Sequence, residues 1–267
     1  MKIKKPGDWV RHFETHGGGW KEPDWTDLPP SLLDVEKRIL LANSLAIFQL
    51  GESGGGTRLR RFVRRTLEQA DHRDDYLGDQ HAVDLFLAEE NEHARLLAEL
   101  VGYLGGQLRQ KHWMNGLFRK TRTLLGLEFN LQVLLTAELI AEVYYGLLYQ
   151  RVPDPVIRTV CGRIVRDEVG HIGFHRSFFH WRQRTQLPGA TVIWSLQFQF
   201  LFLVAETLVW RTHGACLGAF GIERSLFVHR ARAVCRRFLE GLDGQSLAPE
   251  IGEQIPNPVL VENGAGR

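Results

Sequence analysis

Two copies of the motif Glu-x-x-His are the residues most suited to chemistry, Glu90 with His93 and Glu168 with His171. On an α-helix, positions i and i+3 lie about 60° apart on one face, so a carboxylate and an imidazole at this spacing can reach the same metal ion. With eleven histidines in the chain, roughly one such match is expected by chance, so the motif alone is weak.

The helix faces that carry these motifs support the interpretation that they bind metal. Helical steps away from the two motifs reach apolar residues, namely Val83, Phe86, Leu97, Cys161 and Ile164. Single glutamates interrupt two further apolar stripes, since Glu52 follows Leu45 and Phe48, and Glu138 follows Leu131 and Leu134. Burying a carboxylate without a partner is costly, and metal coordination is one way to make it tolerable. A buried polar network without metal is the alternative.

One glutamate from each of two helices and Glu-x-x-His from each of two others is the ligand pattern of ferritin-like di-iron or di-manganese proteins. The ordered series resembles that superfamily over residues 34–185. Within it, Glu52-Ser53-Gly54 and the stretch from Ala88 to His93 are similar to soluble acyl-carrier-protein desaturases. The stretch from Asp154-Pro155 to His171 is similar to aldehyde-deformylating oxygenases.

This resemblance implies two iron ions, with a mixed Mn/Fe pair as the alternative. One ion would be bound by Glu52, Glu90 and His93, and the other by Glu138, Glu168 and His171, with Glu90 and Glu138 each able to bridge. Carboxylates with one imidazole per ion suit Fe or Mn better than Zn or Cu(I).

Three neighbours of the ligand series are candidate catalytic residues. Glu142 lies one turn past Glu138 and could relay protons or replace Glu138 as the ligand. Tyr145 continues that face as a hydrogen-bond donor or radical site, or as a core tyrosine. His175, two turns past Glu168, could ligate or hydrogen-bond near the site, or be a core histidine with its bonds satisfied.

Three other acids are not expected to be ligands: Glu89, Glu92 and Asp167. We expect Glu92 to be solvated surface. Asp167 could hydrogen-bond a ligand histidine on a neighbouring helix, as imidazole ligands usually require, or be a plain surface charge.

The elements that must position these residues are helices. Periodic apolar positions predict helices over about 34–52, 79–104, 125–150, 155–184, 191–213 and 222–240, with no competing strand alternation. Ser31, with Asp34 at capping-box spacing, is the expected start of the first, and Asp154 with Pro155 caps the fourth. The sequence thus predicts an all-α protein: an extended arm over 1–30, a ferritin-like four-helix bundle over 31–185, added helices over 186–240 and an irregular tail over 241–267.

Composition narrows the classes of function. A hydrophobic content of 44% and a net charge of +2 exclude a disordered chain and make a nucleic-acid partner unlikely. Three widely spaced cysteines suggest neither a disulfide framework nor a rubredoxin module, and we expect a cytoplasmic protein. No nucleotide-binding fingerprint is present, so electrons for a redox cycle would come from a separate donor.

The predicted function is therefore a non-haem di-iron oxidoreductase that activates O2 and hydroxylates, desaturates or deformylates a hydrophobic substrate, fatty-acyl by resemblance. Alternatives are a rubrerythrin-like peroxidase, a ferroxidase, and a non-catalytic helical interaction protein. We expect a homodimer. The arginine-rich cluster from Arg58 to Arg65 could dock an acidic electron donor or carrier protein, or simply be a solvated face. The apolar stretch 191–210 could be a core helix or a peripheral membrane contact.

Overall fold

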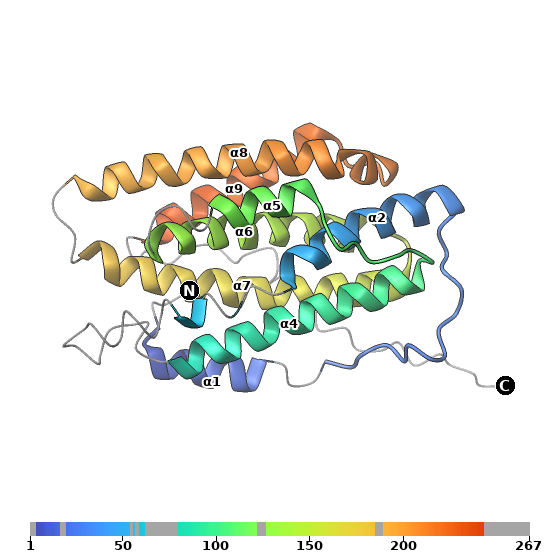
Figure 1. Cartoon of the computed structure of the whole chain (residues 1–267), viewed down its shortest axis with the longest axis horizontal. Coiled ribbons are helices and arrows are strands. Elements are labelled where there is room, and N and C mark those ends of the chain that lie inside the picture. Colours follow the sequence, from blue (N-terminus) through green and yellow to red (C-terminus); the bar gives the residue numbers. More distant parts are fainter. Residues whose placement is uncertain are drawn as a thin grey trace.

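The computed structural model describes residues 4–16, 20–53, 56, 59–61, 80–121, 127–184 and 189–242, and Figure 1 shows their arrangement. All the regular structure in these residues is helical, as predicted. The helices among these residues are α1 (Pro6–His16), α2 (Val35–Glu52), α4 (Gln80–Tyr103), α5 (Trp113–Thr121), α6 (Leu127–Arg151), α7 (Pro155–Arg184), α8 (Ala190–Ala219) and α9 (Arg224–Leu242).

Four long helices, α2, α4, α6 and α7, position the ligand series. Helix α2 packs against α4, α6 packs against α7, and α4 also contacts α7. The bounds of the four helices agree with the predicted ranges to within about two residues, the usual uncertainty of helix ends. Helix α6 is the central one, because 94% of its most apolar stretch is buried.

Aspartates fix where two of these helices begin. Asp34 caps α2 by accepting a hydrogen bond from the backbone N–H of Lys37 at 2.8 Å, so the predicted cap at Ser31 is wrong. The Ser31 hydroxyl instead donates to Asp154 at 2.7 Å, as does the Tyr103 hydroxyl at 3.0 Å. Asp154 also caps α7, as predicted, and thereby ties together the starts of α2 and α7 and the end of α4.

The extended arm predicted over residues 1–30 is wrong for residues 6–16, which form α1. Pro6 occupies the first helical position and Asp8 lies in the first turn, where each is favoured. Trp9 and Phe13 are four residues apart on one face, and both are buried against α4 and α7. Only these two residues form the buried apolar stripe of the segment, which is too short to predict a helix. Tertiary packing therefore stabilises α1.

The C-terminal helices are present as predicted, and α8 is longer than expected because it continues through Gly214 and Gly218. Helix α5 was not predicted. Helix α8 contacts α2, α6 and α9, and it forms the upper edge of the molecule in Figure 1. By length and composition, α6 and α8 could each cross a membrane. The two differ in burial, since 94% of the apolar stretch of α6 is buried inside the protein and only 28% of that of α8. The predicted tail lies outside the described residues beyond Leu242.

Candidate metal centre

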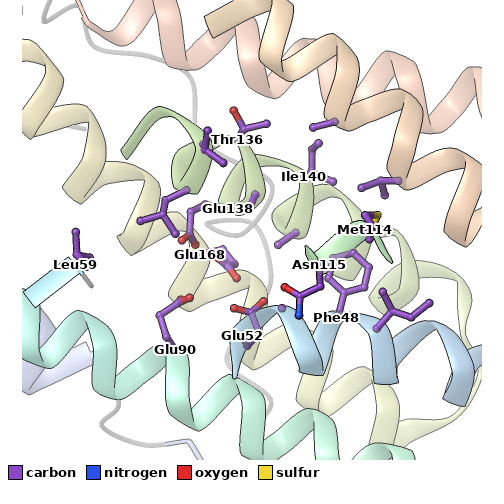
Figure 2. Close-up of a pocket in the computed structure, with 18 of the residues that line it drawn as sticks. Phe48, Glu52, Leu59, Glu90, Met114, Asn115, Thr136, Glu138, Ile140 and Glu168 are labelled. Atoms are coloured by element: carbon purple, nitrogen blue, oxygen red, sulfur yellow. The ribbon is translucent and has the colours of Figure 1, made fainter. Parts of the chain in front are cut away.

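The six residues of the predicted ligand series meet inside the helical core. Glu52 lies at the end of α2, Glu90 and His93 in the middle of α4, Glu138 on α6, and Glu168 and His171 on α7. Figure 2 shows the carboxylates of Glu52, Glu90, Glu138 and Glu168 turned toward one another. His93, Glu168 and His171 are at most 1% exposed, and Glu138 is 4% exposed.

Two of these carboxylates lie between the two imidazoles. Nδ1 of His171 is 3.1 Å from Oε1 of Glu90 and 3.3 Å from Oε2 of Glu168. Nδ1 of His93 is 3.8 Å from Oε1 of Glu90 and 3.7 Å from Oε1 of Glu168. Ligand atoms of all four residues lie within 4.8 Å of one another, so the cluster could hold a metal ion.

Which carboxylates bridge two ions stays a prediction, but the positions between the imidazoles can be compared with the predicted pair, Glu90 and Glu138. Glu90 lies between the imidazoles as expected, but the second such position belongs to Glu168. Glu138 is beside one imidazole only, with Oε2 at 3.3 Å from Nδ1 of His171. Glu52 interacts with Glu90 at the cavity wall.

Acidic side chains hold the outer nitrogens of both imidazoles. Nε2 of His93 is 3.1 Å from Oδ2 of Asp167, and Nε2 of His171 is 3.0 Å from Oε2 of Glu89. Of the two alternatives for Asp167, the structure shows the hydrogen bond and not the surface charge, since this residue is 1% exposed. A carboxylate at Nε2 fixes the ring orientation and leaves Nδ1 as the free ligand atom. The role of Glu89 was missed, because sequence alone does not show which way α4 is rotated.

The cluster contains more carboxyl groups than cationic groups to balance them, and this imbalance shifts the pKa of its members. Burial, and then the neighbouring Glu90 carboxylate, raise the pKa of Glu52 well above its usual range. Burial and the adjacent Glu138 do the same to the pKa of Glu168, while the pKa of Glu138 is lowered despite burial by its hydrogen bonds to Glu168 and His171. Opposite directions are expected for two carboxyls that share a proton. Burial would lower the pKa of His171, but contacts with four glutamates outweigh it and raise that pKa.

Three buried atoms at the centre make no well-aligned hydrogen bond within the described residues: Nδ1 of His93, Oε1 of Glu90 and Oε2 of Glu168. The two carboxylate oxygens lie within 3.3 Å of Nδ1 of His171, but the hydrogen-bond geometry is poor. Buried polar atoms are rarely left this way in native proteins. All three belong to the group that could hold an ion, and all are atoms of the type that Fe or Mn accepts. The donor set therefore fits a metal ion.

The three candidate catalytic residues are all buried. Glu142 is 0% exposed one turn beyond Glu138, and Tyr145 is 0% exposed on the same helix. Burial, followed by the Glu52 carboxylate, raises the pKa of Tyr145 well above its usual value. Its hydroxyl has no hydrogen-bond partner in the described part of the chain. His175 is 2% exposed, and its ring meets that of Phe86 edge-on at 5.8 Å.

A cavity of about 750 Å³ adjoins the cluster, and Glu52, Glu90, Glu138 and Glu168 form part of its wall. Most other lining residues are apolar, including Phe48, Phe86 and Leu134, which the sequence suggested would surround the site. Figure 2 shows Phe48, Met114 and Ile140 beside the acidic end. The lining from α5 and α8 was missed: α5 gave no periodic signal, and the apolar run of α8 was assigned to the core.

The arginine cluster from Arg58 to Arg65 is described only at Arg60 and Arg61. Both are exposed, and Arg60 forms an ion pair with Asp84. Arg58, Arg64 and Arg65 lie outside the described residues, so docking at this cluster stays a prediction.

A scan against protein-family models and searches of curated proteins and of solved structures give no match for this chain. The case for its function therefore stands on the cluster and on the cavity beside it.

Proposed function

We propose that this chain is a non-haem di-metal oxidoreductase of the ferritin-like type, which uses O2 to oxidise a hydrophobic organic substrate. The observation that carries the proposal is that a buried Glu/His cluster forms one wall of a large apolar cavity. A structural polar network needs no cavity beside it, whereas an oxidising centre needs space for the substrate.

The donor set supports two ions better than one. Four carboxylates offer up to eight oxygen donors and two imidazoles add two nitrogens, more than the six positions of a single octahedral site. Glu90 and Glu168 each face both imidazoles. The side chains of Glu52, Glu90, His93, Glu138, Glu168 and His171 would hold the two ions. Iron is the proposed metal, with a mixed Mn/Fe pair as the alternative.

When bound there, a pair of reduced iron ions would supply the electrons and the Lewis acidity needed to activate O2. The chain's own residues do the rest. Asp167 and Glu89 hold the imidazoles in one orientation, which limits the reorganisation needed during the reaction. The apolar wall excludes water and holds a C–H bond of the substrate near the acidic end. Tyr145 keeps its proton, because its pKa is raised, and its hydroxyl is a donor close to Glu52.

Metal content is the first test. Protein expressed in iron-replete cells should carry about two Fe or Mn per chain, the number that this ligand set holds in ferritin-like proteins. Glu168→Gln should lose most of it. Glu36→Gln, which replaces an exposed glutamate in the first turn of α2, is the matched control. Wild-type protein with well under one metal per chain, or a Glu168→Gln variant as metal-rich as the control, would refute the metal centre.

Product formation is the second test. Chemically reduced, metal-loaded protein is exposed to O2 with fatty acids, fatty aldehydes or acyl thioesters, and organic products are identified by mass spectrometry. Ala205→Phe would fill the cavity from α8, while Ala215→Phe adds the same bulk at an exposed position on that helix. We expect the first to lose product while keeping metal, and the second to behave as wild type. Iron oxidation with mineral uptake and no organic product would favour a ferroxidase instead.

A further inference from the structure

Helix α8 exposes an unusually apolar stripe. Six large hydrophobic side chains near its N-terminal half are between 39% and 69% exposed: Val192, Ile193, Leu196, Phe200, Leu203 and Val204. They recur at the three- and four-residue spacing of one helix face, along roughly 18 Å of helix axis. Contiguous apolar patches of this kind on a protein surface commonly mark an interaction site.

The opposite face of α8 is anchored in the protein. Trp194, Phe198 and Phe202 are buried there, and their rings form a continuous stack that reaches α9 at Phe238. Further along, Glu206 and His213 are buried as well. A helix that crossed a bilayer alone would place these two polar residues in hydrocarbon. The structure therefore leaves one stripe available, which suits a helix lying on a surface and not one spanning it.

The charges around the stripe are of one predominant sign. No charged residue occurs from Gly189 to Ala205, and the first acid, Glu206, is buried and paired with Arg232 at 3.2 Å. From residue 189 to residue 242 the chain has six arginines and three glutamates. Four arginines of this segment are exposed, Arg211, Arg224, Arg232 and Arg236, against two exposed glutamates, Glu223 and Glu240. An apolar stripe on a pair of helices with a net positive charge is complementary to the surface of a bilayer that contains anionic lipids.

The stripe is continuous with the cavity beside the metal centre. Val204 belongs to both, and Leu201, Ala205 and Leu208 of the same helix also line the cavity. Leu117 of α5, which is 46% exposed, is a lining residue as well. The Thr212 hydroxyl of α8 donates a hydrogen bond to the sulfur of Met114 on α5, another lining residue, so the two helices meet beside the cavity. The hydrophobic surface thus extends without a polar break from the outside of α8 to the cavity wall.

We propose that the stripe Val192–Val204 is a membrane-binding face that rests on the surface of an anionic bilayer. If the proposed function holds, this placement lets a lipid-like substrate pass from the bilayer into the cavity between α5 and α8. A second copy of the chain fits the stripe less well, because it would cover Val204 at the cavity, and because protein interfaces carry a polar rim with hydrogen bonds that this uncharged stripe does not offer.

Vesicle flotation of the full-length protein tests the proposal. The wild type should float with vesicles of phosphatidylcholine and phosphatidylglycerol, and more weakly with phosphatidylcholine alone. The double variant Ile193→Glu/Phe200→Glu should lose at least about tenfold in partitioning, because two charges replace two of the most exposed apolar side chains. Val35→Glu is the matched control, since Val35 is 61% exposed at the start of α2, outside the stripe.

Several outcomes would overturn the proposal. They are a wild-type protein that floats with neither vesicle, a double variant that floats as well as the wild type, and a double variant that only turns a dimer into a monomer. Circular dichroism checks that each variant is folded. Glu168→Gln should float like the wild type, so loss of the metal centre and loss of membrane binding are separate results.

Discussion

Replacing Asp167 by Asn should weaken metal binding and destabilise the metal-free protein, although Asp167 is not itself placed as a ligand. Its carboxylate is 1% exposed and joins two groups: Oδ2 accepts from Nε of Arg163 at 2.7 Å and contacts Nε2 of His93 at 3.1 Å. Burial opposes ionisation of Asp167, but the hydrogen bond with His93 and the charge of Arg163 outweigh it and lower its pKa. The variant therefore removes a buried negative charge that the structure uses at neutral pH.

The expected loss of stability and the expected loss of metal affinity in Asp167→Asn can be estimated separately. Breaking a buried ion pair by removing one partner costs about 3–5 kcal/mol, and the lower end applies here because Asn still accepts one hydrogen bond. At about 2.1 cal/mol/K per residue, a loss of about 3 kcal/mol in a chain of this size lowers Tm by about 5 °C. Loss of the partner that orients an imidazole ligand typically weakens metal affinity about 10- to 100-fold.

Two measurements separate these effects. Urea unfolding of metal-free protein gives the stability, and anaerobic titration with Fe(II) or Co(II) gives the affinity. The double variant Arg163→Met/Asp167→Asn removes the stranded guanidinium, so it should regain stability without regaining metal affinity. Glu92→Gln is the control, because Glu92 is 38% exposed and its surface pair with Arg95 should contribute no more than about 1 kcal/mol.

The reasoning about Asp167 would be refuted by a variant that binds metal within twofold of the wild type. If stability fell while affinity did not, Asp167 would serve the fold and not the centre. If neither the free energy of unfolding nor the metal affinity changed, the contact between Asp167 and His93 would contribute to neither. Equal loss of affinity in Glu92→Gln would point to a general change in α4.

Two further predictions concern the fold around the site. Burial lowers the pKa of His213 from 6.5 to about 3. Below pH 6.5 this histidine therefore binds a proton in the unfolded protein but stays neutral in the folded protein. Its contribution to the free energy of unfolding is present above pH 6.5 and is lost as the pH falls. Wild-type stability should therefore fall by about 2 kcal/mol more between pH 8 and pH 5 than that of His213→Gln, measured by urea unfolding, and equal slopes would contradict this. Phe13→Ala should weaken the docking of α1 by about 3 kcal/mol, because Phe13 is buried against Phe174 and His171. A ferrous chelator should then strip the metal faster from Phe13→Ala than from Val10→Ala on the same helix, and unchanged removal rates would show that α1 does not cover the centre.

The sequence located the residues of the buried Glu/His cluster, which could hold a metal ion, because two independent signals coincide there. Each glutamate of the series interrupts an apolar stripe, and the period of the stripe fixes which face of the helix is buried. It could not assign the second carboxylate between the imidazoles, because that depends on how far α7 is rotated against its neighbours. The same limit applies to Glu89, which adjoins Glu90 in sequence but reaches His171 from another helix.

The short helices escaped prediction for a different reason. Helix α1 has 11 residues and α5 has nine, and helices of this length are marginal without tertiary contacts. What stabilises α1 is the burial of Trp9 and Phe13 on partners more than sixty residues away in the chain, such as Phe86 and Phe174. No local pattern can report such contacts. The result matters for function, because α1 covers one side of His171.

The charges at the centre of the cluster indicate that its carboxylates serve cation binding and do not stabilise the fold. Arg163 neutralises Asp167 at the edge of the centre, whereas Glu90, Glu138 and Glu168 pair with the imidazoles of His93 and His171. Glu52 adds a fourth buried carboxyl beside Glu90. Without metal, these four acids must take up protons or repel one another, which makes them a cost to the fold. Removing Glu168, whose pKa is raised, should therefore leave metal-free protein as stable as before or more stable, while removing Asp167, whose pKa is lowered, should destabilise it. Metal-free Glu168→Gln with a higher Tm, and Asp167→Asn with a lower one, would be the signature of a site whose acids are compensated only by bound cations.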